Sequence, residues 1–228
     1  MIESIRDRLA RVEERISQAA SRVGRDASSV KLVAVSKMMP VDAIRQAVDA
    51  GVTTLGENRV QEAHAKIALL PGLAAWHLVG HLQTNKAKLA VQLFEMIHSL
   101  DSLKLAQELD KHGGQSTTVV RCLIEVNLGS EESKSGTTEE GVRPLLEGAK
   151  ILPHLRIDGL MTIPPYLADP EAVRPFFRRL RNLRDKLVGE GWRLPELSMG
   201  MTHDFEVAIE EGATLVRIGT AIFGARPV

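Results

Sequence analysis

Residues 196–224 read ELSMGMTHDFEVAIEEGATLVRIGTAIFG, and this stretch decides the fold class. A short apolar run at residues 196–198 and a β-branched run at residues 215–218 have the composition of buried strands. Between them, residues 204–211 have the apolar spacing of a helix. A strand, a helix and a second strand in this order form a parallel βα unit.

The same alternation extends back through the chain. Short apolar runs predict strands at residues 30–36, 53–55, 76–79, 94–99, 119–126, 157–161, 196–198 and 215–218. The stretches between them predict helices at residues 41–50, 59–69, 84–93, 102–112, 139–151, 170–190 and 204–211. Eight parallel strands close a barrel, so the predicted fold is a single α/β domain with a (β/α)8 TIM barrel. An open doubly wound sheet is the alternative, because several of these strands are short.

An additional helix precedes the first strand. One face carries apolar residues at steps of three, four and seven, and the helix is expected to end near Gly24. These residues are Ile2, Ile5, Leu9, Val12, Ile16 and Val23. Without a Pro/Gly/Ser-rich linker, we expect one domain over residues 1–228, with the helix of residues 1–24 packed on the barrel. The polar segment GSEESKSG at residues 129–136 predicts a loop after the fifth strand.

Composition excludes several classes of protein. The 29 basic and 29 acidic side chains cancel, so no net field draws the chain to nucleic acid or to a membrane. The arginines of residues 174–184 are interpreted as a solvated helix face. The single cysteine, Cys122, has no intramolecular disulfide partner and lies in an apolar run, which indicates a buried thiol. With no signal peptide and no membrane-spanning run, a cytoplasmic location is expected.

Lys37 directly follows the first predicted strand. In a parallel barrel, ligands bind at the carboxyl ends of the strands, so this lysine is expected at the mouth of the barrel. Desolvation there disfavours the ammonium form and leaves a neutral amine that can attack an aldehyde. Most lysines at strand ends simply reach into solvent, so this feature alone is weak.

The loops after the last two strands suit a phosphate. Gly200 and Gly219 allow a ligand to approach the backbone, and Thr202 and Thr220 add hydroxyl donors. In this fold the phosphate pocket is usually formed by the loops after strands seven and eight. The alternative is that both glycines are turn residues and that Thr202 only caps a helix.

Six motifs along the whole chain carry a resemblance to a known family. They are LVAVSK (32–37), GENRVQE (56–62), WHLVGHLQTNK (76–86), GLMT (159–162), LSMGMT (197–202) and VRIGTAIFG (216–224). With these motifs the chain resembles the pyridoxal phosphate homeostasis proteins, whose barrel is similar to the N-terminal domain of alanine racemase. One departure is Thr202 followed by His203, where the family has serine and a variable residue; the hydroxyl is retained.

The resemblance implies a fold-type III barrel that binds pyridoxal 5'-phosphate, held as a Schiff base on Lys37. It implies that Arg217 faces the pyridine nitrogen, where an arginine can donate a hydrogen bond but cannot keep that nitrogen protonated. The full implied set of cofactor-binding residues is Lys37, Asn58, His81, Met161, Ser198, Met199, Gly200, Thr202, Arg217, Gly219 and Thr220. Ser198, Met199, Gly219 and Thr220 would hold the phosphate, while Asn58, His81 and Met161 would form the wall beside the ring.

Three functions are compatible with a lysine at the mouth of such a barrel. The resemblance favours a non-catalytic carrier that buffers pyridoxal phosphate and passes it to apo-enzymes. An amino-acid racemase or decarboxylase with weak activity is the alternative; only eleven residues follow Arg217, so we expect no second catalytic domain, and Tyr166 is the sole tyrosine. A Schiff-base aldolase without cofactor does not explain the phosphate loops. A monomer is expected. No metal is expected, since His77 and His81 would lie roughly 13 Å apart on a strand.

Overall fold

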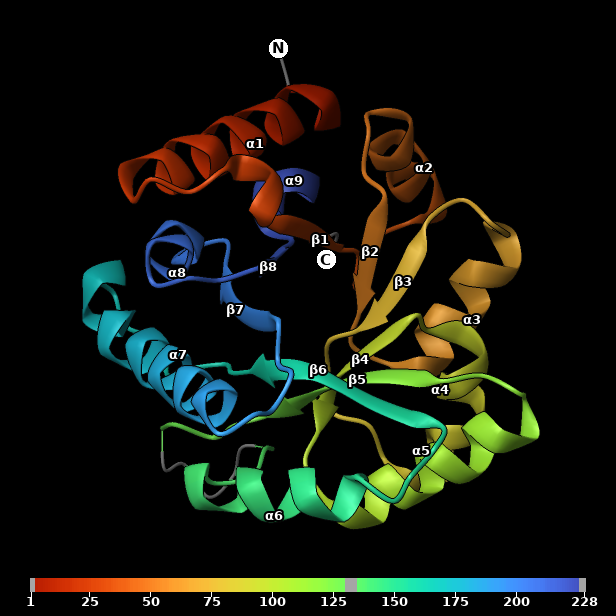
Figure 1. Ribbon diagram of the computed structural model, residues 1–228. Helices are drawn as coiled ribbons and strands as arrows, with labels where there is room; N and C mark the ends of the chain where they lie inside the picture. Colours follow the sequence, from red (N-terminus) through yellow and green to blue (C-terminus); the bar gives the residue numbers. More distant parts are fainter. Residues whose placement is uncertain (1–2, 130–134, 226–228) are drawn as a thin grey trace.

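Eight parallel strands close into a barrel in the order in which they occur along the chain (Figure 1). This computed structural model describes residues 3–129 and 135–225. The strands are β1 (Lys31–Val35), β2 (Thr54–Glu57), β3 (Ala75–Leu78), β4 (Met96–Leu100), β5 (Val120–Glu125), β6 (Leu155–Met161), β7 (Glu196–Met201) and β8 (Leu215–Ile218). The barrel closes because β1 pairs in parallel with both β2 and β8. The prediction of a (β/α)8 TIM barrel is confirmed, and the open doubly wound sheet was wrong.

Two strands run two or three residues beyond the carboxyl ends expected from the sequence. The expected strand of residues 53–55 continues to Glu57, and that of residues 196–198 continues to Met201. Glycine and glutamate have low strand propensity, which is why the sequence pattern ended these strands too early. Pairing with the neighbouring strand overrides that propensity: Glu57 lies opposite Leu78, and Met201 lies opposite Arg217.

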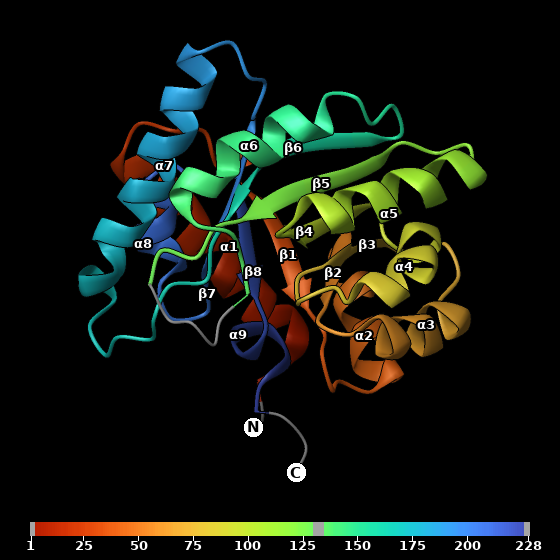
Figure 2. The same ribbon diagram turned by 90° about the horizontal axis from the view of Figure 1, so that it is seen from below.

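Helices surround the barrel and cover the outer face of the strands (Figure 2). They are α1 (Ile5–Arg22), α2 (Val41–Asp49), α3 (Val60–Leu69), α4 (Ala87–Leu93), α5 (Leu103–Gln115), α6 (Glu139–Ala149), α7 (Arg174–Gly189), α8 (Phe205–Glu210) and α9 (Thr220–Phe223). Short 3₁₀ turns, Thr84–Lys86 and Pro170–Val173, precede α4 and α7, so the α-helical parts begin later than the sequence pattern predicts. Within the described residues, no helix is both long enough and apolar enough to cross a membrane.

The N-terminal helix completes the ring of helices. α9 is a single turn, and α1 packs beside it against α8, α9 and α2 (Figure 1). Ser4 caps α1, because its hydroxyl accepts a hydrogen bond from the Asp7 amide at 3.2 Å. The expected apolar face is buried except at its ends. Val23 is 43% exposed because the helix ends there, and Ile2 lies outside the described residues.

Residues along each strand alternate between the barrel interior and the helices. An interior cluster comprises Val33, Val79, Met96, Leu123, Met161 and Leu215. Neighbours such as Ala34, Cys122 and Val216 belong instead to the larger cluster shared with the helices. Because of this alternation, one of the last two residues of a strand faces the interior at the carboxyl end of the barrel. Arg217 and Glu125 are two such residues, because they follow Leu215 and Leu123 at a spacing of two.

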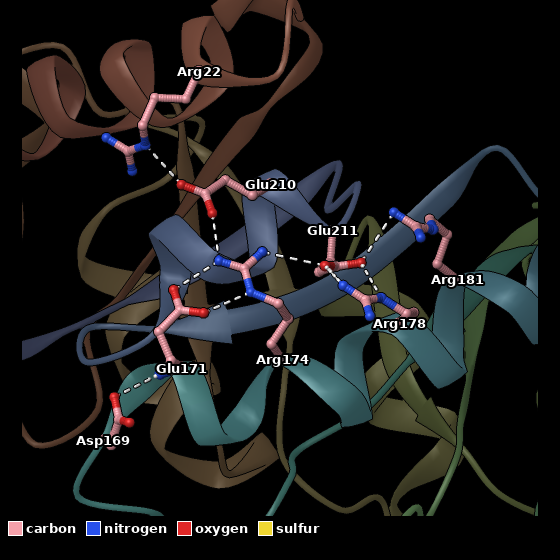
Figure 3. A network of polar contacts seen from close by, with 8 residues as sticks. All are labelled: Arg22, Asp169, Glu171, Arg174, Arg178, Arg181, Glu210 and Glu211. Carbon is pink, nitrogen blue, oxygen red and sulfur yellow. Dashed lines mark hydrogen bonds and ion pairs between the residues drawn. The ribbon is translucent and has the colours of Figure 1, made fainter.

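The arginines of α7 do not form a simple solvated face. Arg174, Arg178 and Arg181 converge on the buried carboxylate of Glu211 at distances of 3.2, 2.9 and 3.0 Å (Figure 3). Glu210 joins Arg174 to Arg22 on α1, at 2.6 and 2.7 Å. This ion network ties α7 and α1 to α8 and to the turn that follows it, and α8 in turn follows the loop after β7.

Candidate functional site

A cavity of about 750 Å³ opens at the carboxyl ends of the strands. Its wall is formed by residues at or just after the ends of β1, β2, β3, β5, β6, β7 and β8. This is where ligands bind in barrels of parallel strands. The volume lies within the roughly 300–1,000 Å³ of small-molecule sites.

The structure brings most of the expected site residues to this cavity. Those that line it are Lys37, Asn58, His81, Thr202, Arg217, Gly219 and Thr220. The other four, Met161, Ser198, Met199 and Gly200, are not among the lining residues. Residues of the loops after β7 and β8 therefore line the same cavity as Lys37.

The four remaining residues lie close to the cavity but face elsewhere. Met161 belongs to the interior cluster of the barrel, and Met199 packs among the residues between strands and helices. Gly200 has a φ of 91°, and a Cβ there would lie 2.6 Å from the Cβ of Ala208. Gly200 is thus needed for the close approach of α8 to the end of β7.

Arg217 is a buried cation held by neutral groups. Its Nη1 donates to Ser198 Oγ at 2.6 Å, and its Nη2 donates to the carbonyl of Thr162 at 2.9 Å. Burial lowers the pKa of Arg217 to about 10, although Asp204 and Glu125 oppose this, so it stays charged at neutral pH. No carboxylate of the described residues forms an ion pair with it. Ser198 therefore positions Arg217, and the guanidinium places a positive charge at the wall of the cavity.

Two histidines extend this hydrogen-bonded chain into the barrel. His98 Nδ1 lies 2.9 Å from Ser198 Oγ, and His98 Nε2 lies 3.0 Å from His77 Nδ1. Burial lowers the pKa of His77 to about 4 and that of His98 well below its usual range. Both imidazoles are therefore neutral, which lets each ring donate from one nitrogen and accept at the other. The imidazole of His98 therefore fixes the Ser198 hydroxyl, which in turn orients Arg217.

A buried charged cluster fixes the backbone on both sides of Lys37. Lys66 Nζ donates to the carbonyl of Ser36, to Glu57 Oε1 and to Glu62 Oε1, each at 2.7 Å. Ser36 also donates its hydroxyl to Glu57 Oε1 at 2.6 Å. The next contact lies beyond Lys37, where the amide of Met38 donates to Glu62 Oε1 at 2.5 Å.

The turn after Lys37 is strained. Met38 has a φ of 61°, in the left-handed region that non-glycine residues rarely adopt. Such a conformation persists where the surroundings impose it, and the Glu62 carboxylate is the group that holds the Met38 amide. Lys66 and Glu62 thus position the segment that carries Lys37.

The electrostatics of this cluster follow from its burial. Burial raises the pKa of Glu57, and hydrogen bonds from Lys66 and Ser36 oppose that rise. One of its oxygens, Oε2, has no hydrogen-bond partner. For Glu62 burial also acts to raise the pKa, but hydrogen bonds from Lys66 and the Met38 amide outweigh it and lower the value.

Sequence reasoning missed several residues of the site. Glu57, Lys66, Ser36 and Glu125 were not singled out. For Glu125 a signal existed, since strict alternation from Leu123 places it on the interior face at the cavity end of β5. For Lys66 none did, because a lysine in the middle of a helix ordinarily faces solvent.

Known proteins share both the sequence and the barrel of this chain. Residues 8–227 match the family described as alanine racemase, N-terminal domain. The chain is 51% identical over 222 residues to the pyridoxal phosphate homeostasis protein of Aquifex aeolicus, covering 96% of this chain and 97% of that protein. It is 41% identical over 225 residues to the protein of the same name from Escherichia coli strain K12, covering 96% and 95%. The chain belongs to the pyridoxal phosphate homeostasis protein family.

Solved structures agree with this membership. PipY of Synechococcus elongatus, solved with PLP bound, is similar with a TM-score of 0.82 and 39% identity over 93% of this chain and 100% of that one. Alanine racemase of Clostridium difficile has a TM-score of 0.72 at 16% identity and shares the fold alone. This homeostasis-family chain spans 58% of that racemase.

Proposed function

We propose that this protein binds pyridoxal 5'-phosphate at the cavity and holds it as a Schiff base on Lys37. The observation that carries the proposal is the convergence of Lys37 and the buried cation Arg217 on one cavity with the loops after β7 and β8. An aldehyde that bears an anionic phosphate and a basic ring nitrogen matches these groups. The names of the homologous proteins and the cofactor in PipY support the same ligand.

Each group of the chain has a defined part in binding. Lys37 supplies the neutral amine that displaces the aldehyde oxygen as water. Arg217 donates toward the ring nitrogen, and Ser198 orients Arg217. Of the four residues that the resemblance implies for the phosphate, Gly219 and Thr220 line the cavity, and their backbone amides and hydroxyl hold it, with Thr202 and Gly200 close by. The other two, Ser198 and Met199, do not line the cavity. Asn58 and His81 form the wall beside the ring, and Met161 lies below it in the barrel.

The bound cofactor is stored and handed on rather than used in turnover. The cofactor supplies an electron sink when its ring nitrogen is protonated, and an arginine partner leaves that nitrogen unprotonated. We therefore propose a monomeric, cytoplasmic carrier that buffers the reactive aldehyde and delivers it to apo-enzymes. The homeostasis name of the homologues supports this role over that of a racemase or decarboxylase.

An absorbance titration of apo-protein with pyridoxal phosphate, followed by borohydride reduction and peptide mass analysis, tests the proposal. We expect saturable uptake and a reduced adduct on Lys37. Lys37→Ala should lose the adduct and keep weaker, phosphate-driven binding, while Lys104→Ala, on the exposed side of α5, should behave as wild type. A protein that takes up no cofactor, or an adduct on another lysine, contradicts the proposal.

Transfer and turnover are tested separately. Loaded protein is mixed with a pyridoxal-phosphate-dependent apo-enzyme, and the recovery of that enzyme's activity is followed. Chiral analysis of alanine and other amino acids incubated with loaded protein measures turnover. Racemisation well above that of free cofactor would support the enzyme alternative, whereas transfer without racemisation supports the carrier.

A further inference from the structure

Glu125 is a buried acid in the cavity that the binding scheme above does not use. It is the last residue of β5, it is only 7% exposed, and it lines the same cavity as Lys37 and Arg217. Its Oε2 atom is buried and has no hydrogen-bond partner. A buried carboxyl oxygen without a partner costs free energy, so its retention at a cavity wall calls for a role toward whatever fills that cavity.

The position of Glu125 relative to Lys37 follows from the barrel. Strands β1 and β5 lie opposite each other when eight strands close in sequence order. Lys37 follows β1 and Glu125 ends β5, so the two side chains line the cavity from opposite sides. A ligand attached to the long lysine side chain would lie between them.

Charged groups around Glu125 favour its neutral form. Burial chiefly, with a smaller contribution from Asp101 after β4, raises the pKa of Glu125 to about 7, although Arg217 on β8 opposes the rise. Asp101 also lies 3.5 Å from the ring of His81 after β3, and Asp204 after β7 acts on Arg217. His98 on β4 is neutral. Near neutral pH the Glu125 carboxyl therefore exists in both forms, which suits a group that gives up and takes back a proton.

Formation of the Schiff base requires such a proton. The neutral Lys37 amine, the aldehyde and one proton give the protonated imine and one water. The proton is needed at the aldehyde oxygen, which leaves as that water. In the reverse direction, water adds to the imine carbon, one proton is given up, and the neutral amine and the aldehyde return.

We propose that Glu125 is the acid–base residue of this exchange, donating the proton as the cofactor is attached to Lys37 and accepting it as the cofactor is released. This inference rests on the proposed function and deepens it, because it assigns the residue that sets how fast the carrier loads and unloads. Other acids and bases of the cavity are less suited. The side chain of His81 is 49% exposed and lies beside Asp101, and Tyr166 is 80% exposed. The third, His203, has its Nε2 atom 3.1 Å from the carbonyl oxygens of Leu167 and Ala168.

Glu125→Gln tests the proposal, because glutamine retains the shape and the hydrogen-bonding groups but transfers no proton. Loading of apo-protein with pyridoxal phosphate is followed by stopped-flow absorbance, and release is followed by transfer to an excess of apo-enzyme. General acid–base residues contribute about 100-fold or more, so we expect both rates to fall by about that factor. The dissociation constant should change by less than about 3-fold, since a catalyst of exchange affects both directions equally.

The pH profile separates catalysis from a structural role. Wild-type loading should lose the contribution of the acid form as the pH rises through about 7, and this decline should be absent from Glu125→Gln. Asp101→Asn should move the decline to lower pH, because it removes a negative charge that holds the pKa of Glu125 up. This second variant and the wild-type profile remain informative if Glu125→Gln folds poorly.

Outcomes that overturn the inference differ from those that overturn the proposed function. Wild-type rates in Glu125→Gln, or a dissociation constant that rises as much as the rates fall, exclude the acid–base role while cofactor binding stands. If neither wild type nor Glu125→Gln forms a borohydride-fixed adduct on Lys37, the Schiff base itself is excluded.

Discussion

Replacing Lys66 with methionine tests whether the buried charged cluster stabilises the segment around Lys37. Methionine has a similar length and no charge, so the change removes all three donors of the ammonium group. Glu57, which is fully buried, then keeps only the hydroxyl of Ser36 as a partner. Glu62 is less affected, because its side chain is 25% exposed and it still accepts from Met38.

The expected loss follows from the buried carboxylate left behind. Removing one partner of a buried ion pair typically costs about 3–5 kcal/mol, chiefly because the other charge is uncompensated. In a chain of this size that corresponds to a fall in Tm of about 10 °C. Lys66→Met with Glu57→Gln removes both charges, so the double variant should be more stable than Lys66→Met alone.

The loss should depend on pH. Without Lys66, the pKa of Glu57 in the folded state rises further above its unfolded value. Folded protein then binds more protons than unfolded chain in the window between the two values, so the stability of the variant falls as pH rises through it. The difference from wild type should therefore widen as the pH rises from the unfolded pKa of a glutamate toward the raised folded pKa of Glu57.

Urea unfolding followed by far-UV circular dichroism measures these free energies. Lys31→Met is the matched control: its ion pair with Glu196 spans 3.2 Å, but the lysine side chain is 64% exposed. Exposed pairs contribute about 1 kcal/mol or less, so the control should stay within that range. A loss for Lys66→Met no larger than that of the control would refute the reasoning.

Three further predictions concern packing, ionisation and thiol reactivity. Gly159→Ala should lower the free energy of unfolding by about 3 kcal/mol, because the new Cβ would lie 1.9 Å from the carbonyl oxygen of Glu196. Gly189→Ala, whose Cβ meets nothing within 4 Å, should be neutral or stabilising by about 0.5–1 kcal/mol in the same urea unfolding experiments. Burial acts to raise the pKa of Glu211, but hydrogen bonds from Arg178 and Arg174 outweigh burial, and the pKa is lowered. The stabilisation by Glu211 is therefore present at neutral pH and is lost as the pH falls through its folded pKa. Glu211→Gln should therefore be less stable than wild type at neutral pH, and the difference should shrink as acidification protonates Glu211 in the folded wild type; a difference that stays constant during acidification contradicts the assignment. Burial raises the pKa of the Cys122 thiol, so a thiol reagent should label it only on unfolding, and rapid labelling of native protein would show that the strand is accessible.

Much of the fold was predictable because its signals are local. Alternating apolar runs and amphipathic segments specify strands and helices, and eight of each pattern leave few ways to bury them other than a barrel. The apolar spacing of residues 5–20 likewise specified the buried face of α1. The ends of two strands were predicted wrongly because strand pairing determines where they end. Glu57 and Met201 are strand residues only because neighbouring strands form hydrogen bonds with their segments.

The site was predictable to the extent that strand ends reveal it. Lys37 and Arg217 could be placed at the mouth of the barrel, because each lies at or directly after the end of an apolar strand. The role of Ser198 could be recognised only in the tertiary structure. Its hydroxyl lies 2.6 Å from Arg217 on β8 and 2.9 Å from His98 on β4. The two contacts join residues that are separated by 19 and by 100 positions in the chain. Contacts over such separations produce no periodic pattern in a sequence.

The sequence by itself determined the barrel, the lysine at its mouth and the glycine- and threonine-bearing loops beside it. Backbone propensity and hydrophobic periodicity act over a few residues, so the order of residues alone is sufficient for these features. Only the tertiary structure decided which ionisable groups are buried together. It placed Lys66 beneath the turn of Lys37 and left Glu125 unpartnered at the cavity wall, because burial and charge pairing depend on distances through space rather than along the chain.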